Sequence, residues 1–524
     1  LADLMGVFGD LRRLWRGVRT LARHDALIPR EYAGRLPPSF RMARTLTGSR
    51  KAKDADTTPG KRLALALESL GPAYIKLGQV LATRPDIVGG DVAGSLVSLQ
   101  DRLPPFPTDV ARKVVTEALG MPLENLFSSF SEPVAAASIA QVHLAQTTED
   151  PPQRVAVKVL RPEVRDEFAR DLRAFALAAR IAERFSREAR RLRLKAVVET
   201  LARSVALELD LRMEAAAASE LAERTRADPD FRIPAVDWKR TQDSVLTTEW
   251  VDGTPIRDRA ALIAAGFDPA EIARIVIRSF LTQALRDGFF HADMHPGNLF
   301  VDADGRVVAV DFGIMGRLDP DMRRFMAETL AGFLARDYRR VADVHYEYGF
   351  VPAYHPVDTF AQALRAVGEP VFGRRARDVS MGRLLQQLFE TTRRFDMRAQ
   401  PQLILLQKTM MVVEGVARGL DPDFDIWDAS RPVIEDWMIG HVGPEARLRD
   451  AAEGMTALGK LAQNLPQLLR NAETVSQMLA EGGIRIHPDS ARAIALAQAA
   501  RTRHVRVAVW IMVAALGAIA ASLF

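Results

Sequence analysis

The chain of 524 residues contains no cysteine, which excludes disulfide scaffolds, iron–sulfur clusters and thiol catalysis. The sequence also has little excess of either charge, because 71 lysines and arginines are balanced by 66 aspartates and glutamates. The net charge is +5. So small an excess over so long a chain does not indicate a nucleic-acid-binding protein. Hydrophobic residues make up 48% of the sequence and charged residues 26%, the balance of a folded globular protein.

The sequence also lacks an internal repeat and the GxxxxGK[ST] pattern of P-loop nucleotide-binding proteins. Helical periodicity is present over 61–82 and 163–225, and a mainly helical pattern runs from 256 to about 440. Strand-like runs are shorter and fall at 155–160, 244–251 and 299–313. A small region of mixed helix and strand followed by a mainly helical one predicts an α+β fold.

The first 24 residues have the spacing of a basic amphipathic helix. Apolar residues recur at helical spacing, and arginines lie between them: Leu11, Leu14, Trp15, Val18 and Leu21, with Arg12, Arg13, Arg16, Arg19 and Arg23. Two interpretations remain open for this helix, because it could rest on a membrane surface or pack on the body of the protein.

Residues 507–524 form an uncharged run at the other end of the chain. As a helix they span about 27 Å, close to the ~30 Å hydrocarbon thickness of a bilayer, although a buried core helix is the alternative. Arg501, Arg503 and Arg506 precede the run, which by the positive-inside tendency places the body of the protein on the cytoplasmic side. We therefore expect a membrane anchor at 505–524, with the body of the protein on the cytoplasmic side.

Residues 291–313, HADMHPGNLFVDADGRVVAVDFG, carry the strongest chemical signal. Two short strands flank the Asp-Gly pair that a tight hairpin turn needs. Asp293 and Asn298 then lie on the loop that enters the hairpin, and Asp311 lies on its exit, so the three side chains can converge at one edge. Two carboxylates and one amide form an oxygen-rich set suited to Mg²⁺ bound to phosphates.

These spacings are similar to the protein-kinase signature, in which an aspartate precedes a metal-binding asparagine by five residues and an Asp-Phe-Gly follows. That signature also requires an upstream lysine on a strand, and Val-Ala-Val-Lys158 supplies it. The strand at 244–251, with Glu249 and Val251 at its end, fits the hinge that binds adenine through backbone groups. The glycine-rich loop is absent, and a different run stands in its place: Ala135, Ala136, Ala137 and Ser138.

With its departures from ordinary kinases, the chain resembles the AarF/UbiB family of atypical kinase-like proteins over roughly residues 60–440. The motifs that carry the resemblance are KLGQ at 76–79, AAAS at 135–138, VAVK at 155–158, ELDLRMEA at 208–215, HADMHPGN at 291–298 and DFG at 311–313. The resemblance implies a bilobal protein-kinase-like fold of the α+β class. A helical extension at the N-terminal side folds over the active site, and a membrane helix ends the chain.

The resemblance also implies roles for individual residues. Lys158 and Asp293 are expected to be catalytic, Asn298 and Asp311 to bind Mg²⁺, and the Ala135, Ala136, Ala137 and Ser138 loop to cover the phosphates of ATP. In the family, the lysine and glutamine of the KxGQ helix meet the carboxylates of an ExD motif. The regulatory residues implied here are therefore Lys76, Gln79, Glu208 and Asp210, which leaves Glu214 as the partner of Lys158.

The function that the resemblance implies is a Mg-ATP-binding ATPase that supports ubiquinone, or other isoprenoid quinone, biosynthesis at the membrane. Its partners are ATP, a membrane lipid or quinone precursor, and enzymes of quinone biosynthesis. Asp319-Pro320 follows Asp311 so closely that no room remains for an activation segment, which argues against protein phosphorylation.

Two alternatives remain. His291, Asp293 and His295 alternate along the chain and would face one side of a strand, as the ligands of a metal-dependent enzyme do. That interpretation leaves Lys158 and Asp311 unexplained, and the Pro-Gly that follows favours a loop. A nucleotide-binding pseudokinase that acts as a scaffold for quinone-biosynthetic enzymes stays open, because binding and turnover use the same residues.

The boundaries expected from these features are a basic amphipathic helical region at 1–59, a helical extension at 60–110, kinase-like lobes at 111–253 and 254–440, a helical region at 441–504 and the membrane anchor at 505–524.

Overall fold

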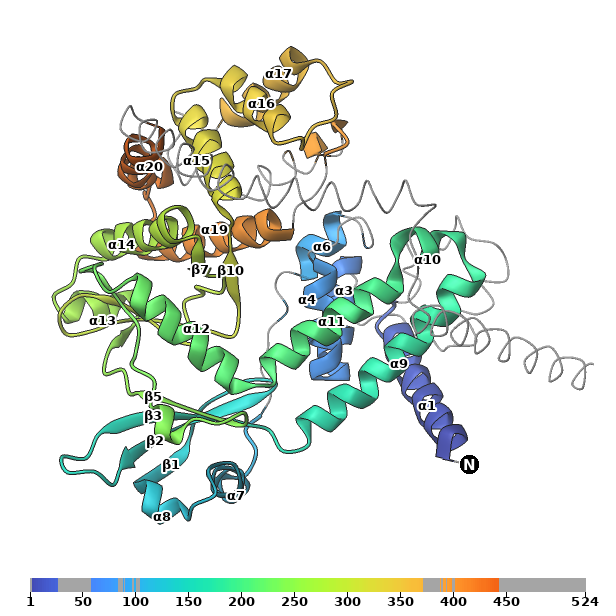
Figure 1. Ribbon diagram of the computed structural model, residues 1–524, viewed down its shortest axis with the longest axis vertical. Coiled ribbons are helices and arrows are strands. Elements are labelled where there is room, and N and C mark those ends of the chain that lie inside the picture. Colours follow the sequence, from blue (N-terminus) through green and yellow to red (C-terminus); the bar gives the residue numbers. More distant parts are fainter. Residues whose placement is uncertain are drawn as a thin grey trace, which may run out of the picture. The chain divides into compact units, whose positions relative to one another are not determined.

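The computed structural model describes residues 2–26, 58–82, 90–96, 104–370 and 401–442, with a few positions between these ranges (Figure 1). The chain divides into two compact units, 1–439 and 440–524, and apart from the end of its last helix everything described belongs to the first. No helix among the described residues is long and apolar enough to cross a membrane. The expected anchor at 505–524 lies outside the described residues, so the structure lends the membrane helix no support.

A four-stranded antiparallel sheet forms the smaller lobe, with the strand order β1-β2-β3-β5. Its strands are β1 (Phe127–Ala136), β2 (Ala140–Thr147), β3 (Arg154–Leu160) and β5 (Val245–Glu249). Alternation sends Val245 into a core with helix α7 (Thr108–Leu119), whereas Leu246 joins a different core on the opposite face. The strands expected at 155–160 and 244–251 are therefore confirmed.

The β1–β2 hairpin was not expected from the sequence. Its pairing register shifts between Phe127 and Ser129, between Phe130 and Pro133, and between Pro133 and Ala135. These irregularities break the two-residue alternation that identifies a strand, and Pro133 lacks the N–H that a regular ladder requires.

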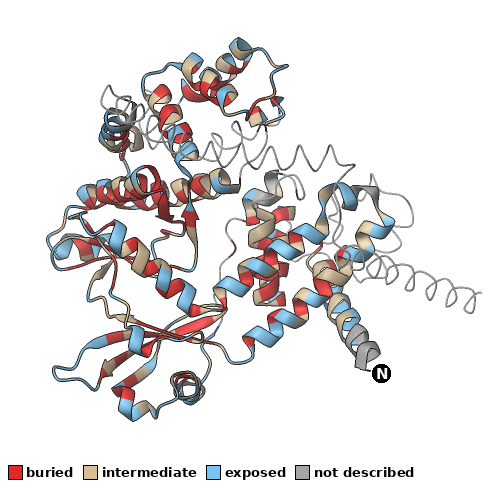
Figure 2. Cartoon of the chain, in the orientation of Figure 1, coloured by how far each residue is buried: buried red, intermediate tan, exposed pale blue. Residues whose placement is uncertain are grey.

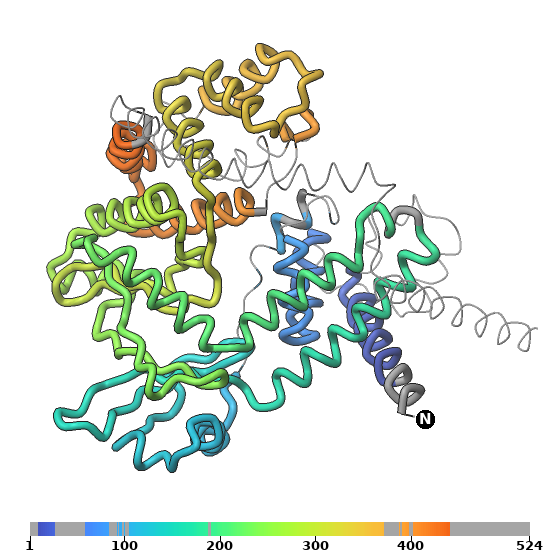
Figure 3. Tube along the Cα trace, in the orientation of Figure 1, coloured from blue at the N-terminus to red at the C-terminus, as the bar shows by residue number. Residues whose placement is uncertain are grey.

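The second core joins the helical extension to the long helices of the smaller lobe. The extension contains α3 (Pro59–Leu70), α4 (Pro72–Ala82) and α6 (Gly90–Leu96), which contact one another. They pack with α9 (Val164–Phe185) and α11 (Leu194–Glu208), two helices that run side by side (Figure 3). Tyr74 meets Phe175 edge to face at 4.9 Å in this core.

The first helix, α1 (Ala2–Arg23), packs on this body. Arg13 pairs with Asp171 of α9 at 2.6 Å, and Gly17 lies against Tyr74, where a Cβ atom would be 2.9 Å from the tyrosine hydroxyl. Leu11 and Trp15 stay exposed, at 45% and 60%. Of the two interpretations of this segment, the structure shows packing on the body.

The larger lobe is mainly helical. Helix α14 (Pro269–Thr282) continues into a π-helical turn, η3 (Gln283–Asp287), and packs against α19 (Pro401–Leu420). Figure 2 shows buried residues along most of α14. Other described helices of this lobe are α13 (Arg259–Ala264), α15 (Pro320–Leu334), α16 (Tyr338–Glu347), α17 (Val357–Gly368) and α20 (Ile426–Val442).

Short strands of the larger lobe position the loops of the candidate site. Strands β8 (Leu299–Val301) and β9 (Val307–Ala309) form the expected hairpin within a sheet of order β4-β9-β8-β6. Its outer strands are β4 (Phe231–Arg232) and β6 (Thr254–Pro255). Strand β7 (Phe289–His291) pairs with β10 (Met315–Arg317), where Gly316 leaves room for the ring of Phe290. The loop that carries Asp293 and Asn298 thus follows β7, and Asp311 lies between β9 and β10.

Candidate active site

Three segments distant in sequence meet at Lys158 of β3. The Lys158 Nζ atom donates to Glu214 at 2.7 Å and 3.0 Å from its two carboxylate oxygens, and to Asp311 Oδ1 at 3.0 Å. Glu214 belongs to α12 (Leu211–Arg224), and its Oε1 atom also accepts the backbone N–H of Phe312 at 3.2 Å. The structure therefore places Glu214, the expected partner, beside Lys158.

Burial and charge act differently on the members of this cluster. Burial disfavours the charge on Lys158, but the carboxylates of Asp311 and Glu214 outweigh it and raise the lysine pKa above its ordinary value. Loss of solvent opposes ionisation of Asp311, yet the charge of Lys158 holds the pKa of Asp311 well below its usual range. For Glu214 burial dominates and raises the pKa to about 6. Asp311 therefore carries the firmest negative charge of the site.

The backbone at Asp311 turns this carboxylate toward the lysine. Asp311 has φ +64°, a left-handed conformation that aspartate tolerates better than most residues. Its side chain is 45% exposed, whereas the ring of Phe312 is buried against His291 with ring centroids 5.4 Å apart. The turn thus anchors Phe312 in the core and leaves the Asp311 carboxylate open to a ligand.

His291 is fully buried and orients the loop that carries Asp293. Its Nδ1 atom accepts the backbone N–H of Asp293 at 3.1 Å, and its Nε2 atom lies 3.3 Å from the carbonyl of Val310, the geometry of a neutral ring with its proton on Nε2. Burial lowers the pKa of His291, consistent with that neutral form. Because both ring nitrogens are engaged by backbone, His291 is not available as a metal ligand.

The His-Asp-His interpretation is therefore wrong for this loop. His295 Nδ1 accepts the N–H of Gly297 at 2.9 Å, and its other nitrogen is 3.9 Å from Asp293. Within the described part of the chain, no group of three or more His, Asp or Glu side chains is arranged to hold a metal ion.

Asn298 and Asp311 fit a different cation. The buried Asn298 amide donates its Nδ2–H to the carbonyl of Asp293 at 3.1 Å, which leaves its oxygen for a cation. The backbone N–H of Val310 donates to the carbonyl of Asn298 at 2.9 Å, so both residues sit on one rigid hairpin. An amide oxygen and an ionised carboxylate are ligands suited to Mg²⁺ when phosphates and waters complete the shell.

The alanine-rich loop, residues 135–138, forms the turn between β1 and β2. Ala135 and Ala136 end β1, and the N–H of Ala137 donates to the carbonyl of Ala140 at 2.8 Å. Ser138 is fully buried, and its hydroxyl has no hydrogen-bond partner. The loop thus occupies the β1–β2 position of a kinase phosphate loop, as the resemblance implied.

An ion pair also connects the extension to α11. Lys76 of α4 lies 2.6 Å from Glu208, and both side chains are largely buried. Gln79 is half-buried one turn further along α4. Asp210 is engaged elsewhere, because it caps α12 and pairs with Arg212 at 2.7 Å. The structure therefore brings Lys76 to Glu208 and gives Asp210 a local role.

Comparison with known proteins agrees with this arrangement. Residues 98–345 match the ABC1 atypical kinase-like domain, and residues 364–425 match the UbiB helical domain. A protein named "Probable protein kinase UbiB" from Marinobacter nauticus is 42% identical over 469 residues, which is 88% of this chain and 85% of that protein. The chain belongs to the UbiB family. The family resemblance expected from the motifs is thereby confirmed.

Other relatives with the same name cover similar stretches. The protein from Azotobacter vinelandii is 44% identical over 407 residues, or 77% of this chain and 75% of that protein. The one from Aeromonas salmonicida is 40% identical over 467 residues, or 88% and 85%. A solved structure titled as the complex of Rv3197 with erythromycin, from Mycobacterium tuberculosis, aligns over 76% of this chain with 24% identity and a TM-score of 0.48.

The hinge of this UbiB-family site stays a prediction, and the structure narrows the backbone groups of Glu249 that could bind adenine. The backbone N–H of Glu249 donates to the carbonyl of Ala235 at 2.8 Å, so it is not available to adenine in this conformation. The Glu249 carboxylate pairs with Arg232 at 2.8 Å. β5 lies beside the segment that follows β4. No local pattern in the sequence reveals that these two segments are neighbours. Val251 is half-buried just beyond β5 and stays a prediction.

Two residues that sequence reasoning missed hold the catalytic loop from the larger lobe. Gln283 of η3 accepts the N–H of His291 at 3.1 Å, and the Thr409 hydroxyl of α19 lies 3.0 Å from the carbonyl of Ala292. Both side chains are fully buried. Their only sequence signal is a polar residue on an apolar helix, which is too common to identify a site by itself.

Proposed function

We propose that this chain binds Mg-ATP and hydrolyses it, and that this activity supports the biosynthesis of ubiquinone or another isoprenoid quinone at a membrane. The observation that carries the proposal is the Lys158 cluster, in which one ammonium group bridges Glu214 on a helix and the left-handed Asp311. Kinase-like proteins use this bridge to hold the α- and β-phosphates of ATP beside the metal.

Each residue of the site then has a role. Lys158 holds the α- and β-phosphates, the loop of residues 135–138 covers them, and Asn298 with Asp311 holds Mg²⁺. The cation, when bound, neutralises charge on the triphosphate. Asp293 orients the nucleophile and takes its proton. The hydrogen bond from the backbone N–H of Asp293 to His291 Nδ1 keeps that carboxylate in place.

The acceptor is water or a small hydroxyl compound in this proposal. Between Gly313 and the N-cap Asp319 the chain forms only the short strand β10 before α15 begins. No segment is left there to dock a peptide. Protein phosphorylation is therefore the less favoured activity, although the relatives carry the name of a kinase.

The membrane setting is part of the proposal. The segment at 505–524, with its uncharged run at 507–524, anchors the chain to a bacterial inner membrane, with the catalytic lobes on the cytoplasmic side. A membrane lipid or quinone precursor then regulates the ATPase, and quinone-biosynthetic enzymes are its partners. ATPase activity that is undiminished without lipid and insensitive to added vesicles would contradict this part.

The test is the thermal stability of the purified protein with and without Mg-ATP. A ligand at about 100 times its Kd adds roughly 2.7 kcal/mol, which is an easily measured shift. Asp311→Asn should abolish the Mg²⁺-dependent shift. Asp304→Asn is the matched control, because Asp304 lies on the same hairpin, 70% exposed and paired with Arg306. No shift in the unaltered protein, or an equal shift in Asp311→Asn, overturns the proposal.

A further inference from the structure

The segment that joins the extension to α7 is held against the alanine-rich loop. We call residues 104–107, Pro-Pro-Phe-Pro, the linker. Its only backbone N–H belongs to Phe106, because the other three residues are prolines. This N–H donates to Gln141 Oε1 at 2.9 Å, and Gln141 Nε2 donates back to the carbonyl of Phe106 at 3.2 Å. One side chain thus pairs with both backbone groups of Phe106.

Gln141 is fully buried, and its remaining donor is used as well. Gln141 Nε2 lies 2.9 Å from His143 Nε2, and His143 Nδ1 donates to the carbonyl of Ser131 at 2.8 Å. These bonds fix which end of the Gln141 amide faces the linker. In the sheet, Gln141 stands directly opposite Ala136 of the alanine-rich loop. The linker is therefore attached to the strand that leaves this loop.

Arg161 makes the second connection. It directly follows β3, and its guanidinium donates to the carbonyl of Ala137 at 2.9 Å and to the carbonyl of Pro104 at 2.7 Å. The same guanidinium lies over the ring of Phe106, 5.6 Å from its centroid. One rigid cation thus touches the loop and the linker together.

The position of Ala137 explains why this contact matters. Its N–H is bound to Ala140 and its carbonyl to Arg161. In a trans peptide the carbonyl and the next N–H point in opposite directions, so the bond from Arg161 also orients the N–H of Ser138. A loop that covers phosphates depends on such orientations, because backbone N–H groups are its donors.

We propose that Arg161 and Gln141 are positioning residues that couple the linker to the alanine-rich loop, so that nucleotide bound under the loop stabilises the linker. The inference rests on the proposed nucleotide function of the site. It deepens that function by connecting the helical extension to the occupancy of the site through a path separate from the Lys76–Glu208 ion pair.

Hydrogen exchange offers a direct reporter, since the linker contains one exchangeable amide. In the full-length protein we expect slow exchange of the Phe106 N–H, and slower exchange by at least about threefold when Mg²⁺ and a non-hydrolysable ATP analogue are added. In Arg161→Gln the Phe106 amide should exchange faster, and the analogue should no longer change its rate.

Affinity and turnover should separate in the same variants. Arg161→Gln should weaken Mg-ATP binding about tenfold, the usual size of a lost charge-assisted hydrogen bond, with turnover at saturation changed less than about twofold. Arg161→Lys should recover part of the affinity, because an ammonium group keeps the charge and the N–H donors of Nη2 but lacks the second bond from Nε to the Ala137 carbonyl.

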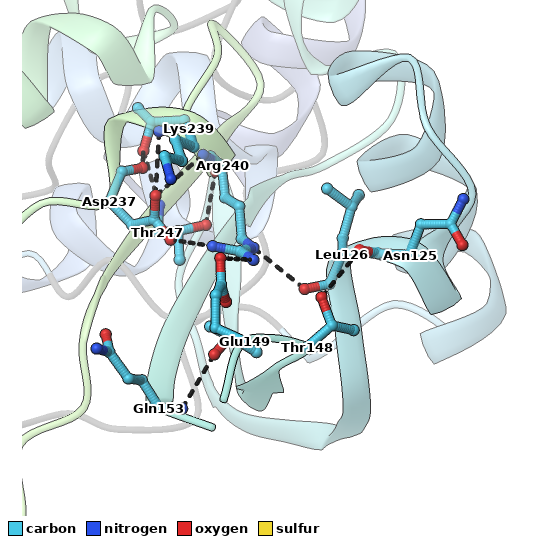
Figure 4. A network of polar contacts seen from close by, with 11 residues as sticks. Asn125, Leu126, Thr148, Glu149, Gln153, Asp237, Lys239, Arg240 and Thr247 are labelled. Carbon is cyan, nitrogen blue, oxygen red and sulfur yellow. Dashed lines mark hydrogen bonds and ion pairs between the residues drawn. The ribbon is translucent and has the colours of Figure 1, made fainter. Parts of the chain in front are cut away.

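Arg240 provides a matched control in the same lobe. Its guanidinium also donates to a backbone carbonyl, that of Leu126 (Figure 4). It lies over a phenylalanine ring as well, 5.7 Å from the centroid of Phe127. Arg240→Lys should lower stability, leave Mg-ATP affinity within about twofold and keep the response of the Phe106 amide.

The outcomes separate this inference from the proposed function. If the unaltered protein shows no stabilisation by Mg-ATP, the proposed function fails and the inference with it. If it is stabilised but the Phe106 amide does not respond to the analogue, the inference alone is overturned. The same holds if Arg161→Gln and Arg240→Lys have equal effects on affinity.

Discussion

Arg240 and Lys158, two cationic residues of the smaller lobe, each pair with two carboxylates. The two side chains differ in their other hydrogen-bond partners and in the exposure of the carboxylates. Arg240 lies in η2 (Trp238–Arg240) and donates to Asp237 at 2.7 Å, to Glu149 at 2.6 Å and to the Leu126 carbonyl (Figure 4). Lys158 donates only to carboxylates, and one of these belongs to a left-handed residue open to solvent.

The difference teaches what each cluster is built for. A guanidinium with a partner for each nitrogen joins strands and turns permanently, because its planar fork cannot be redirected. Lysine is a compact charge on a flexible stem, so it can exchange a carboxylate for a phosphate. The carboxylates differ as well. The hydrogen bond from Arg240 lowers the pKa of the exposed Glu149 to about 2, whereas burial raises that of Glu214 to about 6.

The largest effect is expected at Asp293, which belongs to neither of the two clusters. Asp293→Asn should lower ATP turnover by about 10² to 10⁴, the range for loss of a general base, and leave Mg-ATP affinity nearly unchanged. Steady-state turnover and calorimetric binding measure the two quantities. Undiminished turnover would remove Asp293 from the chemistry, whereas no turnover in the unaltered protein would favour the scaffold alternative.

Exchanging each cation for methionine tests the comparison directly. Lys158→Met should weaken Mg-ATP binding about 100-fold, because a charge-assisted phosphate contact is lost. Arg240→Met should leave binding intact and cost about 2 kcal/mol of unfolding free energy, because a buried carbonyl and two carboxylates lose their donor. Calorimetry and urea unfolding of both variants provide the measurement. If both variants weakened Mg-ATP binding equally, the inferred difference in role between Lys158 and Arg240 would be wrong.

The two glutamates should respond to pH with opposite signs in nucleotide-free protein. Because the pKa of Glu214 is raised, the folded state takes up its proton first, and its contribution to stability rises by roughly 2 kcal/mol as the pH falls from above 6 to 4.5. Because the pKa of Glu149 is lowered, its contribution is complete above about pH 4.5 and is lost as the pH falls toward 2.

Unfolding free energies of the unaltered protein, Glu214→Gln and Glu149→Gln, measured at pH 6.5 and 4.5, check these signs. As the pH falls from 6.5 to 4.5, the unfolding free energy of the unaltered protein should rise relative to that of Glu214→Gln. Its difference from the unfolding free energy of Glu149→Gln should stay constant. A loss relative to Glu214→Gln would mean that the ion pair with Lys158, not burial, decides the titration of that carboxylate.

The smallest effect concerns Asp210, whose expected regulatory role remains a prediction. Its carboxylate accepts the N–H of Arg212 as the N-cap of α12, so Asp210→Ala should cost about 1 kcal/mol and Asp210→Ser much less. Thermal unfolding measures both. If Asp210→Ala instead changed ATP turnover without changing stability, the regulatory role would replace the cap.

The site was partly visible in the sequence because kinase chemistry depends on short spacings. The interval from Asp293 to Asn298 and the Asp311-Phe312-Gly313 triplet lie on one hairpin, so local structure suffices to bring them together. Asp319-Pro320 likewise marks the start of α15 through local capping geometry. Such signals do not depend on the rest of the fold.

The hinge and the linker could not be predicted in the same way. Whether the Glu249 N–H is free depends on Ala235, and the role of Arg161 depends on Pro104 and Ala137. These partners are brought close by packing of separate segments. A sequence pattern carries no information about that distance.

The sequence by itself determined the chemical inventory of this protein, its family motifs, its main helical regions and the strands β3, β5, β8 and β9, because these follow from residue type and short-range periodicity. Only the tertiary structure decided that Lys158 also meets Asp311, that Asp210 caps a helix instead of meeting Lys76, and that α1 packs on the body. The physical reason is that a charge has many nearly equivalent partners along a chain. The packed core selects among them by burying some and exposing others.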